Sequence, residues 1–141
     1  MSAYYEFLLT LPCLKLLMTN RHNPRIAVID DDDSVSEPIR MLMELHGWEA
    51  KSYHSCEAFL ADFDADNPPS CMILDLYFPR MSGVELQRSL VEKGITIPTI
   101  VLTARPDGSL AQSSVEAGAL EVITKPVAGD QLIEKIEAAI N

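Results

Sequence analysis

Apolar and polar positions alternate in blocks along the chain from Arg25 onward. Short apolar runs rich in β-branched residues predict strands at 25–30, 49–53, 71–74, 99–102 and 121–124. Apolar residues at helical spacing predict helices at 34–46, 55–63, 83–92, 110–117 and 128–140. No hairpin signal lies between the strands, so neighbouring strands are joined through helices. The pattern predicts an α/β fold, a three-layer α/β/α sandwich around a five-stranded parallel sheet.

The first and last predicted helices each have an apolar face that we expect to cover the sheet. In helix 34–46 this face is predicted to contain Val35, Ile39, Leu42, Met43 and Leu45. In helix 128–140 it is predicted to contain Leu132, Ile133, Ile136 and Ile140. Three helices are followed by a glycine that can end them in the left-handed conformation, namely Gly47, Gly94 and Gly118.

Residues 1–24 precede this pattern, and we interpret them as an extension outside a domain that spans 25–141. Residues 7–18 read FLLTLPCLKLLM, which is shorter than the roughly 20 apolar residues that a membrane-spanning helix needs. The segment also lacks the basic start and the small-residue cleavage site of a secretory signal. Two interpretations remain: an upstream extension with Met18 as the alternative start, or an amphipathic docking segment.

Composition and charge disfavour several classes of function. The net charge is −10, from 21 acidic and 11 basic side chains, so direct binding to nucleic acid is disfavoured. Three cysteines without a Cys-x-x-Cys pair predict neither a disulfide framework nor a zinc site, which favours a reducing, cytoplasmic location. Cys71 lies in an apolar run and is predicted to be buried. The three histidines, His22, His46 and His54, have no metal-ligand spacing and are predicted to lie at the surface or in loops.

Candidate chemistry gathers where the predicted strands end. The run Asp30–Asp33 follows the first strand, Asp75 the third, Thr103 the fourth and Lys125 the fifth. Each residue alone has an ordinary explanation, such as a solvated turn or a surface lysine. In a parallel α/β sheet, however, ligands bind beyond the carboxyl ends of the strands. Crowded carboxylates there favour Mg²⁺, and a metal, a hydroxyl and an ammonium around Asp75 suit phosphoryl transfer to that carboxylate.

Four segments carry a resemblance to a known family: AVIDDDDSV, LDLYFPRMSGVEL, IVLTA and VITKP. In this order they resemble the receiver domain of bacterial two-component response regulators, over about 25–140. The stretch 83–104 is most similar to receivers that drive helix-turn-helix transcription factors. The resemblance implies a flavodoxin-like strand order of 2-1-3-4-5. It also implies a non-enzymatic signalling domain that assists its own Mg²⁺-dependent phosphorylation and dephosphorylation.

The resemblance also implies roles for individual residues. Asp75 matches the phosphorylated aspartate. Asp30, Asp31, Asp75 and the backbone carbonyl of Tyr77 match the ligands of Mg²⁺. Thr103, Ala104 and Lys125 match the positions that contact the phosphoryl group and switch the domain. Pro126 follows this lysine, as in relatives where the Lys–Pro bond is cis.

The family likewise implies partners. The phosphoryl donor would be a sensor histidine kinase or a phosphotransfer protein. The output would pass to a downstream effector or to a fused DNA-binding domain outside this chain, with a phosphorylation-dependent homodimer as a further option. Neither direct nucleic-acid binding nor membrane association is expected.

Three positions depart from the family pattern. Val122 stands where relatives have a tyrosine or phenylalanine that turns inward on activation. An aromatic switch at that position is therefore not expected here, and movement of Thr103 and the loop 105–109 would carry the change. Asp33 adds a negative charge where many relatives have Pro or Ala. Tyr77 is a bulky neighbour of Asp75 that can screen it from attacking water.

Three other functions remain as alternatives. A phosphatase or phosphotransferase with an aspartyl nucleophile would have a second acid two residues after Asp75, where this chain has Tyr77. A flavin-binding module would need a phosphate-binding loop after the first strand, where four aspartates would repel the flavin phosphate. A pseudo-receiver that binds a partner without being phosphorylated would lack acceptor residues that are present here.

Overall fold

The computed structural model describes residues 23–141. Five strands and five helices alternate along this part of the chain. The strands are β1 (Arg25–Ile29), β2 (Glu49–Tyr53), β3 (Cys71–Leu74), β4 (Thr99–Thr103) and β5 (Glu121–Thr124). The helices are α2 (Asp33–Leu45), α3 (Cys56–Asp62), α4 (Gly83–Glu92), α5 (Ser109–Glu116) and α6 (Gly129–Ile140).

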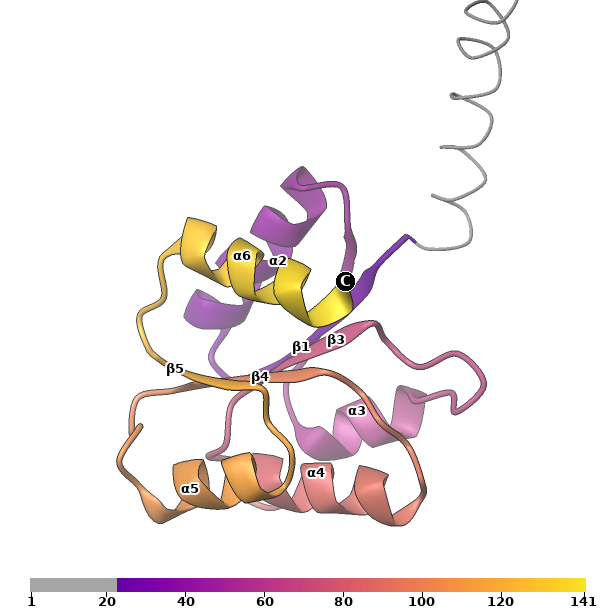
Figure 1. Ribbon diagram of the computed structural model, residues 1–141, viewed down its shortest axis with the longest axis vertical. Helices are drawn as coiled ribbons and strands as arrows, with labels where there is room; N and C mark the ends of the chain where they lie inside the picture. The colour runs from indigo at the N-terminus through magenta and orange to yellow at the C-terminus, as the bar shows by residue number, and fades with distance from the viewer. Residues whose placement is uncertain (1–22) are drawn as a thin grey trace, which may run out of the picture.

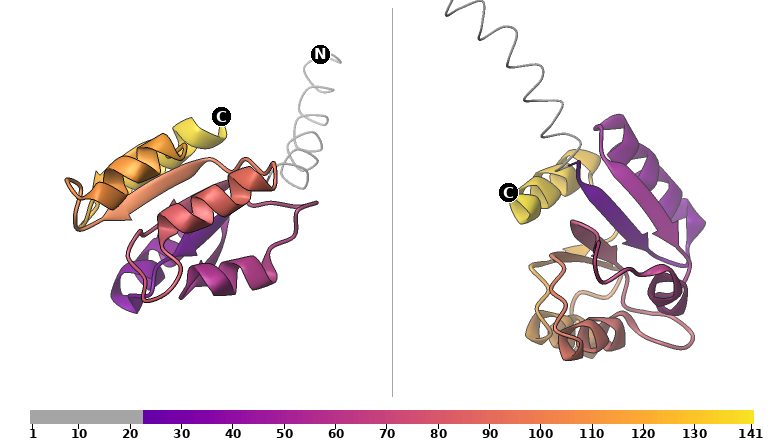
Figure 2. Two further views of the ribbon diagram at one scale, coloured as in Figure 1. Left: turned by 90° about the horizontal axis from the view of Figure 1, so that it is seen from below. Right: turned by 90° about the vertical axis from the view of Figure 1, so that its right-hand side faces the viewer.

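The strands form one parallel sheet in the order β2-β1-β3-β4-β5, as predicted. Helices α2 and α6 cover one face of the sheet, and α3, α4 and α5 cover the other (Figure 1). The turned views show the same layering (Figure 2). The predicted three-layer α/β/α sandwich is therefore confirmed.

Alternating side chains of the central strands fill both sides of the sheet, because successive residues of a strand point to opposite faces. Ile26, Val28, Ile73, Ile100 and Leu102 join the cluster beneath α2 and α6. Ala27, Ile29, Met72 and Leu74 join the cluster beneath α3 and α4. Burial on both faces explains why these strands read as continuous apolar runs. Cys71 is fully buried, as predicted.

Local signals set the ends of the helices. Asp32 caps α2 by accepting a hydrogen bond from the Ser34 amide at 3.0 Å, and Ser55 caps α3 through the Ala58 amide at 3.0 Å. Gly47, Gly94 and Gly118 all have positive φ, which confirms the predicted left-handed residues after α2, α4 and α5.

One prediction for α2 is wrong. Ile39 and Met43 are buried, but Leu45 is 85 % exposed. Each residue of an α-helix turns the chain by about 100°, so Leu45 lies on the opposite side of the helix from Met43. Leu45 thus adds an exposed apolar side chain at the end of α2.

His46 and His54 are exposed, as predicted, whereas His22, Cys13 and the segment 7–18 lie outside the described residues. Asn23 and Pro24 line the same surface cavity as Ile140 and Asn141, so the start of β1 and the end of α6 lie side by side (Figure 1). Within residues 23–141, no helix has both the length and the apolar character needed to cross a membrane.

Candidate functional site

The register of β1 and β3 brings two of the predicted carboxylates together. Ile29 pairs with Leu74, so Asp30 and Asp75 leave the ends of neighbouring strands at the same level. The Asp75 amide donates to the Ile29 carbonyl at 3.0 Å, and the Asp30 amide donates to the Tyr53 carbonyl at 3.0 Å. Both side chains are buried, with Asp30 3 % and Asp75 8 % exposed. Backbone pairing therefore fixes the position of both acids.

Lys125 reaches this pair from the other half of the sheet. Thr103 pairs with Thr124 at the ends of β4 and β5, and the Lys125 amide donates to the Thr103 carbonyl at 2.9 Å. The Lys125 ammonium lies 2.7 Å from Asp30 Oδ2 and 3.3 Å from Asp75 Oδ2. One cation thus bridges two buried carboxylates. The Lys125–Pro126 peptide bond is cis.

The surroundings of Asp75 disfavour its charged form. Burial raises the pKa of Asp75, and the nearby Asp30 carboxylate raises it further, while Lys125 and the Leu76 amide oppose the rise. For Lys125, burial by itself lowers the pKa, but its hydrogen bond to Asp30 and the two negative charges outweigh burial and raise it. The lysine therefore stays charged within an acidic pocket that it does not fully neutralise.

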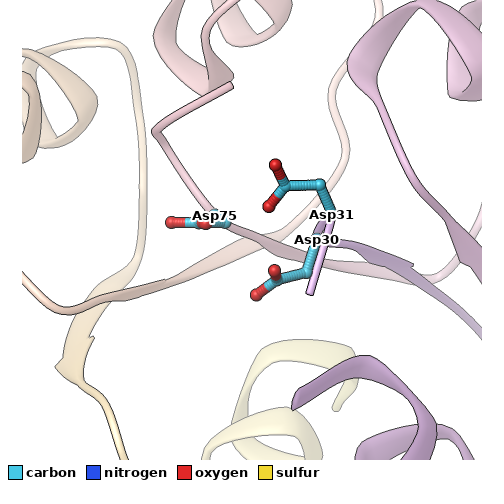
Figure 3. A group of neighbouring side chains, drawn as sticks. All are labelled: Asp30, Asp31 and Asp75. Atoms are coloured by element: carbon cyan, nitrogen blue, oxygen red, sulfur yellow. The ribbon is translucent and has the colours of Figure 1, made fainter. Parts of the chain in front are cut away.

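Asp31 completes an acidic cluster at the rim of this pocket. One carboxylate oxygen from each of Asp30, Asp31 and Asp75 lies within 4.8 Å of the other two. Figure 3 shows the side chains of Asp30 and Asp31 extending to the same side, toward Asp75. Ligands on opposite sides of an octahedral Mg²⁺ are about 4.2 Å apart, and Mg²⁺ prefers oxygen donors. The spacing and the donor atoms fit a magnesium ion, and the Tyr77 carbonyl lies two residues beyond Asp75 on the same loop.

Thr103, the last residue of β4, is fully buried. Its Oγ1 accepts a hydrogen bond from the Arg105 amide at 3.0 Å, which ties the following loop to the strand end. Ala104 stands between them and is exposed. The hydroxyl hydrogen of Thr103 is not used in that bond and remains available to donate to another group.

The hydroxyl end of Tyr77 lies near Gly108, the N-cap residue of α5. The Tyr77 side chain packs with the partly buried Val122 against a cluster formed by Leu76, Val84, Val101 and Ala111. The Arg105 guanidinium carbon lies 4.8 Å from the centre of the Tyr77 ring. The sequence singles out Tyr77 as a neighbour of Asp75, but it does not single out Arg105. The only signal in the sequence is a shared spacing: Tyr77 lies two positions after Asp75, and Arg105 lies two positions after Thr103.

A parallel five-stranded sheet with three acids and a lysine at its carboxyl edge defines a domain of the receiver type. Residues 26–137 match the family model described as the response regulator receiver domain. The chain belongs to this family, and its place is therefore in two-component signal transduction.

Curated relatives agree with this assignment. The transcriptional regulatory protein FixJ of Rhizobium meliloti is 38 % identical over 114 residues, which cover 81 % of this chain and 55 % of FixJ. The response regulator protein TmoT of Ectopseudomonas mendocina is 36 % identical over 115 residues, which cover 82 % of this chain and 52 % of TmoT. The chain thus spans about half the length of the curated relatives it matches.

Solved structures share the fold. The crystal structure of FixJ-N superposes with a TM-score of 0.76 at 36 % identity and covers 84 % of this chain and 94 % of that one. The response regulator StyR gives a TM-score of 0.76 at 33 % identity, covering 84 % of this chain and 59 % of StyR. The beryllofluoride-activated DrrB receiver domain gives a TM-score of 0.73 at 28 % identity, covering 82 % of this chain and 96 % of that one.

Proposed function

We propose that Asp75 is the phosphoacceptor of this receiver domain and that Mg²⁺ assists the transfer. The observation that carries the proposal is the meeting of Asp30, Asp31 and Asp75 within 4.8 Å, with the Lys125 ammonium against two of them. Asp30 and Asp75 are buried and Asp31 is exposed, and the crowding of the two buried acids is costly unless a cation or a reaction makes use of it.

In the proposed reaction an oxygen of the Asp75 carboxylate attacks the phosphorus of a phosphorylated histidine on a sensor kinase or phosphotransfer protein. A P–O bond forms, the P–N bond breaks, and the leaving imidazole takes up a proton. A bound magnesium ion would neutralise the phosphoryl oxygens, and Asp30, Asp31, Asp75 and the Tyr77 carbonyl would hold it. The product is an acyl phosphate on Asp75.

Lys125 and Thr103 would then bind the new phosphoryl group. The Lys125 ammonium lies 3.3 Å from Asp75 Oδ2, within a short movement of a phosphoryl oxygen on that side chain. The Thr103 hydroxyl and the amide of Ala104 would donate to the other oxygens. The group brings about −1.5 to −2 charges, by analogy with other phosphorylated side chains, so both the ammonium and the hydroxyl are drawn toward it.

We propose that this attraction is the switch. Thr103 is tied to the loop 105–109 by its hydrogen bond with the Arg105 amide, so its movement reshapes the surface of α5, β5 and α6. The phosphoryl group can shift the equilibrium between the two conformations of the domain only by the difference in its affinity for them. Val122 is not aromatic, which favours movement of the loop over rotation of a ring at that position.

The domain assignment and the wider setting are also proposals. Residues 25–141 would form the receiver and 1–24 an extension, with Met18 as an alternative start. The relative FixJ, named as a transcriptional regulatory protein, supports an effector or DNA-binding domain as the target, either fused or separate. The domain would work in the cytoplasm, as a signalling domain and not as an enzyme with its own substrate, and phosphorylation would favour a homodimer.

A small phosphodonor with Mg²⁺ tests the proposal. Intact mass should rise by one phosphoryl group, hydroxylamine should remove it, and Asp75→Asn should abolish the gain. A chain that binds Mg²⁺ but never gains this mass would instead be a pseudo-receiver. Release of inorganic phosphate in repeated turnovers without a stable acyl phosphate would support the phosphatase alternative.

A further inference from the structure

The Tyr77 side chain meets the loop that follows β4 at two places. The Arg105 guanidinium carbon lies 4.8 Å from the ring centre, in the range of a cation–π interaction. Gly108 lies near the hydroxyl end, where an added Cβ atom would be 2.7 Å from the Tyr77 hydroxyl oxygen. The seat of this ring therefore exists because residue 108 has no side chain.

Backbone hydrogen bonds connect this seat to the switch residue and to α5. The Arg105 amide donates to Thr103 Oγ1 at 3.0 Å, and the Gly108 amide donates to the Arg105 carbonyl at 3.2 Å. Gly108 is the N-cap of α5, and its own carbonyl accepts from the Gln112 amide at 3.3 Å. Arg105 thus connects Thr103 both to the Tyr77 ring and to the start of α5.

Tyr77 is also joined to the acceptor site and to the core under α5. It follows Asp75 by two residues, and its ring packs against the Leu76, Val84, Val101 and Ala111 cluster. Val122 packs against the same cluster, but it has no aromatic ring whose rotation could accompany a conformational change. Within residues 23–141, Tyr77 is the aromatic side chain that contacts this cluster.

We infer that the Tyr77 ring is a strap that holds the 104–108 loop in the unphosphorylated protein and leaves its seat when Asp75 is phosphorylated. The inference rests on the proposed function, because the phosphoryl group supplies the pull on Thr103. When Thr103 turns toward the phosphoryl oxygens, the Arg105 amide either loses its hydrogen bond to Thr103 Oγ1 or moves with it. In both cases the Arg105 guanidinium moves away from the Tyr77 ring. The loop then has two discrete positions, one with the Tyr77 ring in its seat and one with the ring released.

Fluorine NMR on the full chain tests the strap. The chain has four tyrosines, and in protein labelled with 3-fluorotyrosine the Tyr77 signal is the one that Tyr77→Phe removes. Beryllofluoride with Mg²⁺ serves as the phosphoryl mimic. The Tyr77 signal of the wild-type protein should shift on addition of the mimic, together with the backbone amides of residues 103–110.

Two variants release the ring without the mimic. Gly108→Ala places a methyl group where the Tyr77 hydroxyl lies, and Arg105→Ala removes the guanidinium without adding an atom. In both variants the Tyr77 signal should lie near its mimic-bound position before any mimic is added. Adding Tyr77→Phe to Gly108→Ala removes the clashing oxygen, so the amide shifts of 109–112 should return toward those of the wild-type protein.

The outcomes separate the strap from the proposed function. If the mimic shifts the Thr103 amide but leaves the Tyr77 signal in place, the strap is wrong while the phosphoacceptor role stands. A Tyr77 signal that stays at its wild-type position in both single variants also overturns the strap. If the mimic changes no resonance of the wild-type protein, the proposed function itself fails.

Discussion

Two aspartates in this molecule each contact a lysine, yet their pKa values are shifted in opposite directions. On the surface, Lys51 lies 2.8 Å from Asp62 Oδ2, and the Tyr53 hydroxyl donates to the same oxygen at 2.6 Å. These two hydrogen bonds, with that of Lys51 first, lower the pKa of Asp62. In the pocket, Lys125 lies 3.3 Å from Asp75, yet burial and the Asp30 charge raise the pKa of Asp75.

The difference distinguishes a surface ion pair from the proposed site. Asp62 has a lysine and a hydroxyl to itself and is open to water, so its charge is already satisfied. Asp75 is buried and shares one lysine with Asp30, so the pocket retains negative charge that a metal ion or a reaction can relieve. The same pair of residue types is therefore a surface ion pair in one place and a candidate site in the other.

Removing each lysine should give the largest contrast. Lys125→Met leaves two buried carboxylates without a cation, so the free energy of unfolding without Mg²⁺ should fall by about 3 kcal/mol, the usual cost of breaking a buried ion pair. Lys51→Met should leave it nearly unchanged, because exposed ion pairs contribute little. Urea denaturation in a chelating buffer measures both. Equal losses of unfolding free energy in the two variants would mean that Lys125 does not offset repulsion between buried carboxylates.

Magnesium affinity should separate the same two regions. Asp31→Asn removes one proposed ligand and should weaken binding about tenfold or more, equivalent to about 1.4 kcal/mol. Asp62→Asn is the matched control and should bind as the wild-type protein does. Isothermal titration calorimetry measures both, and an unchanged affinity in Asp31→Asn would exclude Asp31 as a ligand.

Neutralising each aspartate should change stability in opposite directions. Asp75→Asn removes a buried charge that Asp30 repels and keeps an oxygen for the Leu76 amide, so the metal-free protein should gain on the order of 1 kcal/mol. Asp62→Asn loses a charged acceptor and should lower the melting temperature slightly. Thermal unfolding with a chelator present is the measurement, and a loss of stability in Asp75→Asn would show that Lys125 fully compensates the pocket.

The smallest effect concerns pH. The folded state lowers the pKa of Asp62 below its ordinary value of 3.8, so its stabilising contribution is present above that pH. The contribution disappears as the pH falls through the lower pKa of the folded state. Wild type and Asp62→Asn should therefore differ in stability near neutral pH and converge in acid. A difference that grows on acidification would contradict the assigned direction.

The sequence alone predicts the features that follow from the spacing of apolar residues and from the positions where strands end. Buried strands appear as short apolar runs, and the carboxyl ends of parallel strands meet, so Asp30, Asp75 and Lys125 could be expected near one another. Leu45 is the exception, because it lies about 200° around the helix from Met43, so an apolar residue near the end of a helix falls on the exposed face.

Contacts between loop side chains could not be predicted. The stacking of Arg105 on Tyr77 and the approach of the Tyr77 hydroxyl to Gly108 depend on how two loops from different strands lie in space. The same is true of Lys51 and Asp62, which come from β2 and α3. No period in the sequence encodes such pairs, since each residue alone is compatible with an exposed turn or helix end.

Identification of the phosphorylated residue tests the central claim most directly. Protein treated with a small phosphodonor and Mg²⁺ can be reduced with borohydride, which converts an aspartyl phosphate to homoserine, and then digested and mapped by mass spectrometry. The account predicts homoserine at position 75 alone, in the wild-type protein and in Asp62→Asn, and none in Asp75→Asn. Homoserine at Asp31 or another acid, or an unmodified Asp75 in phosphorylated protein, would contradict it.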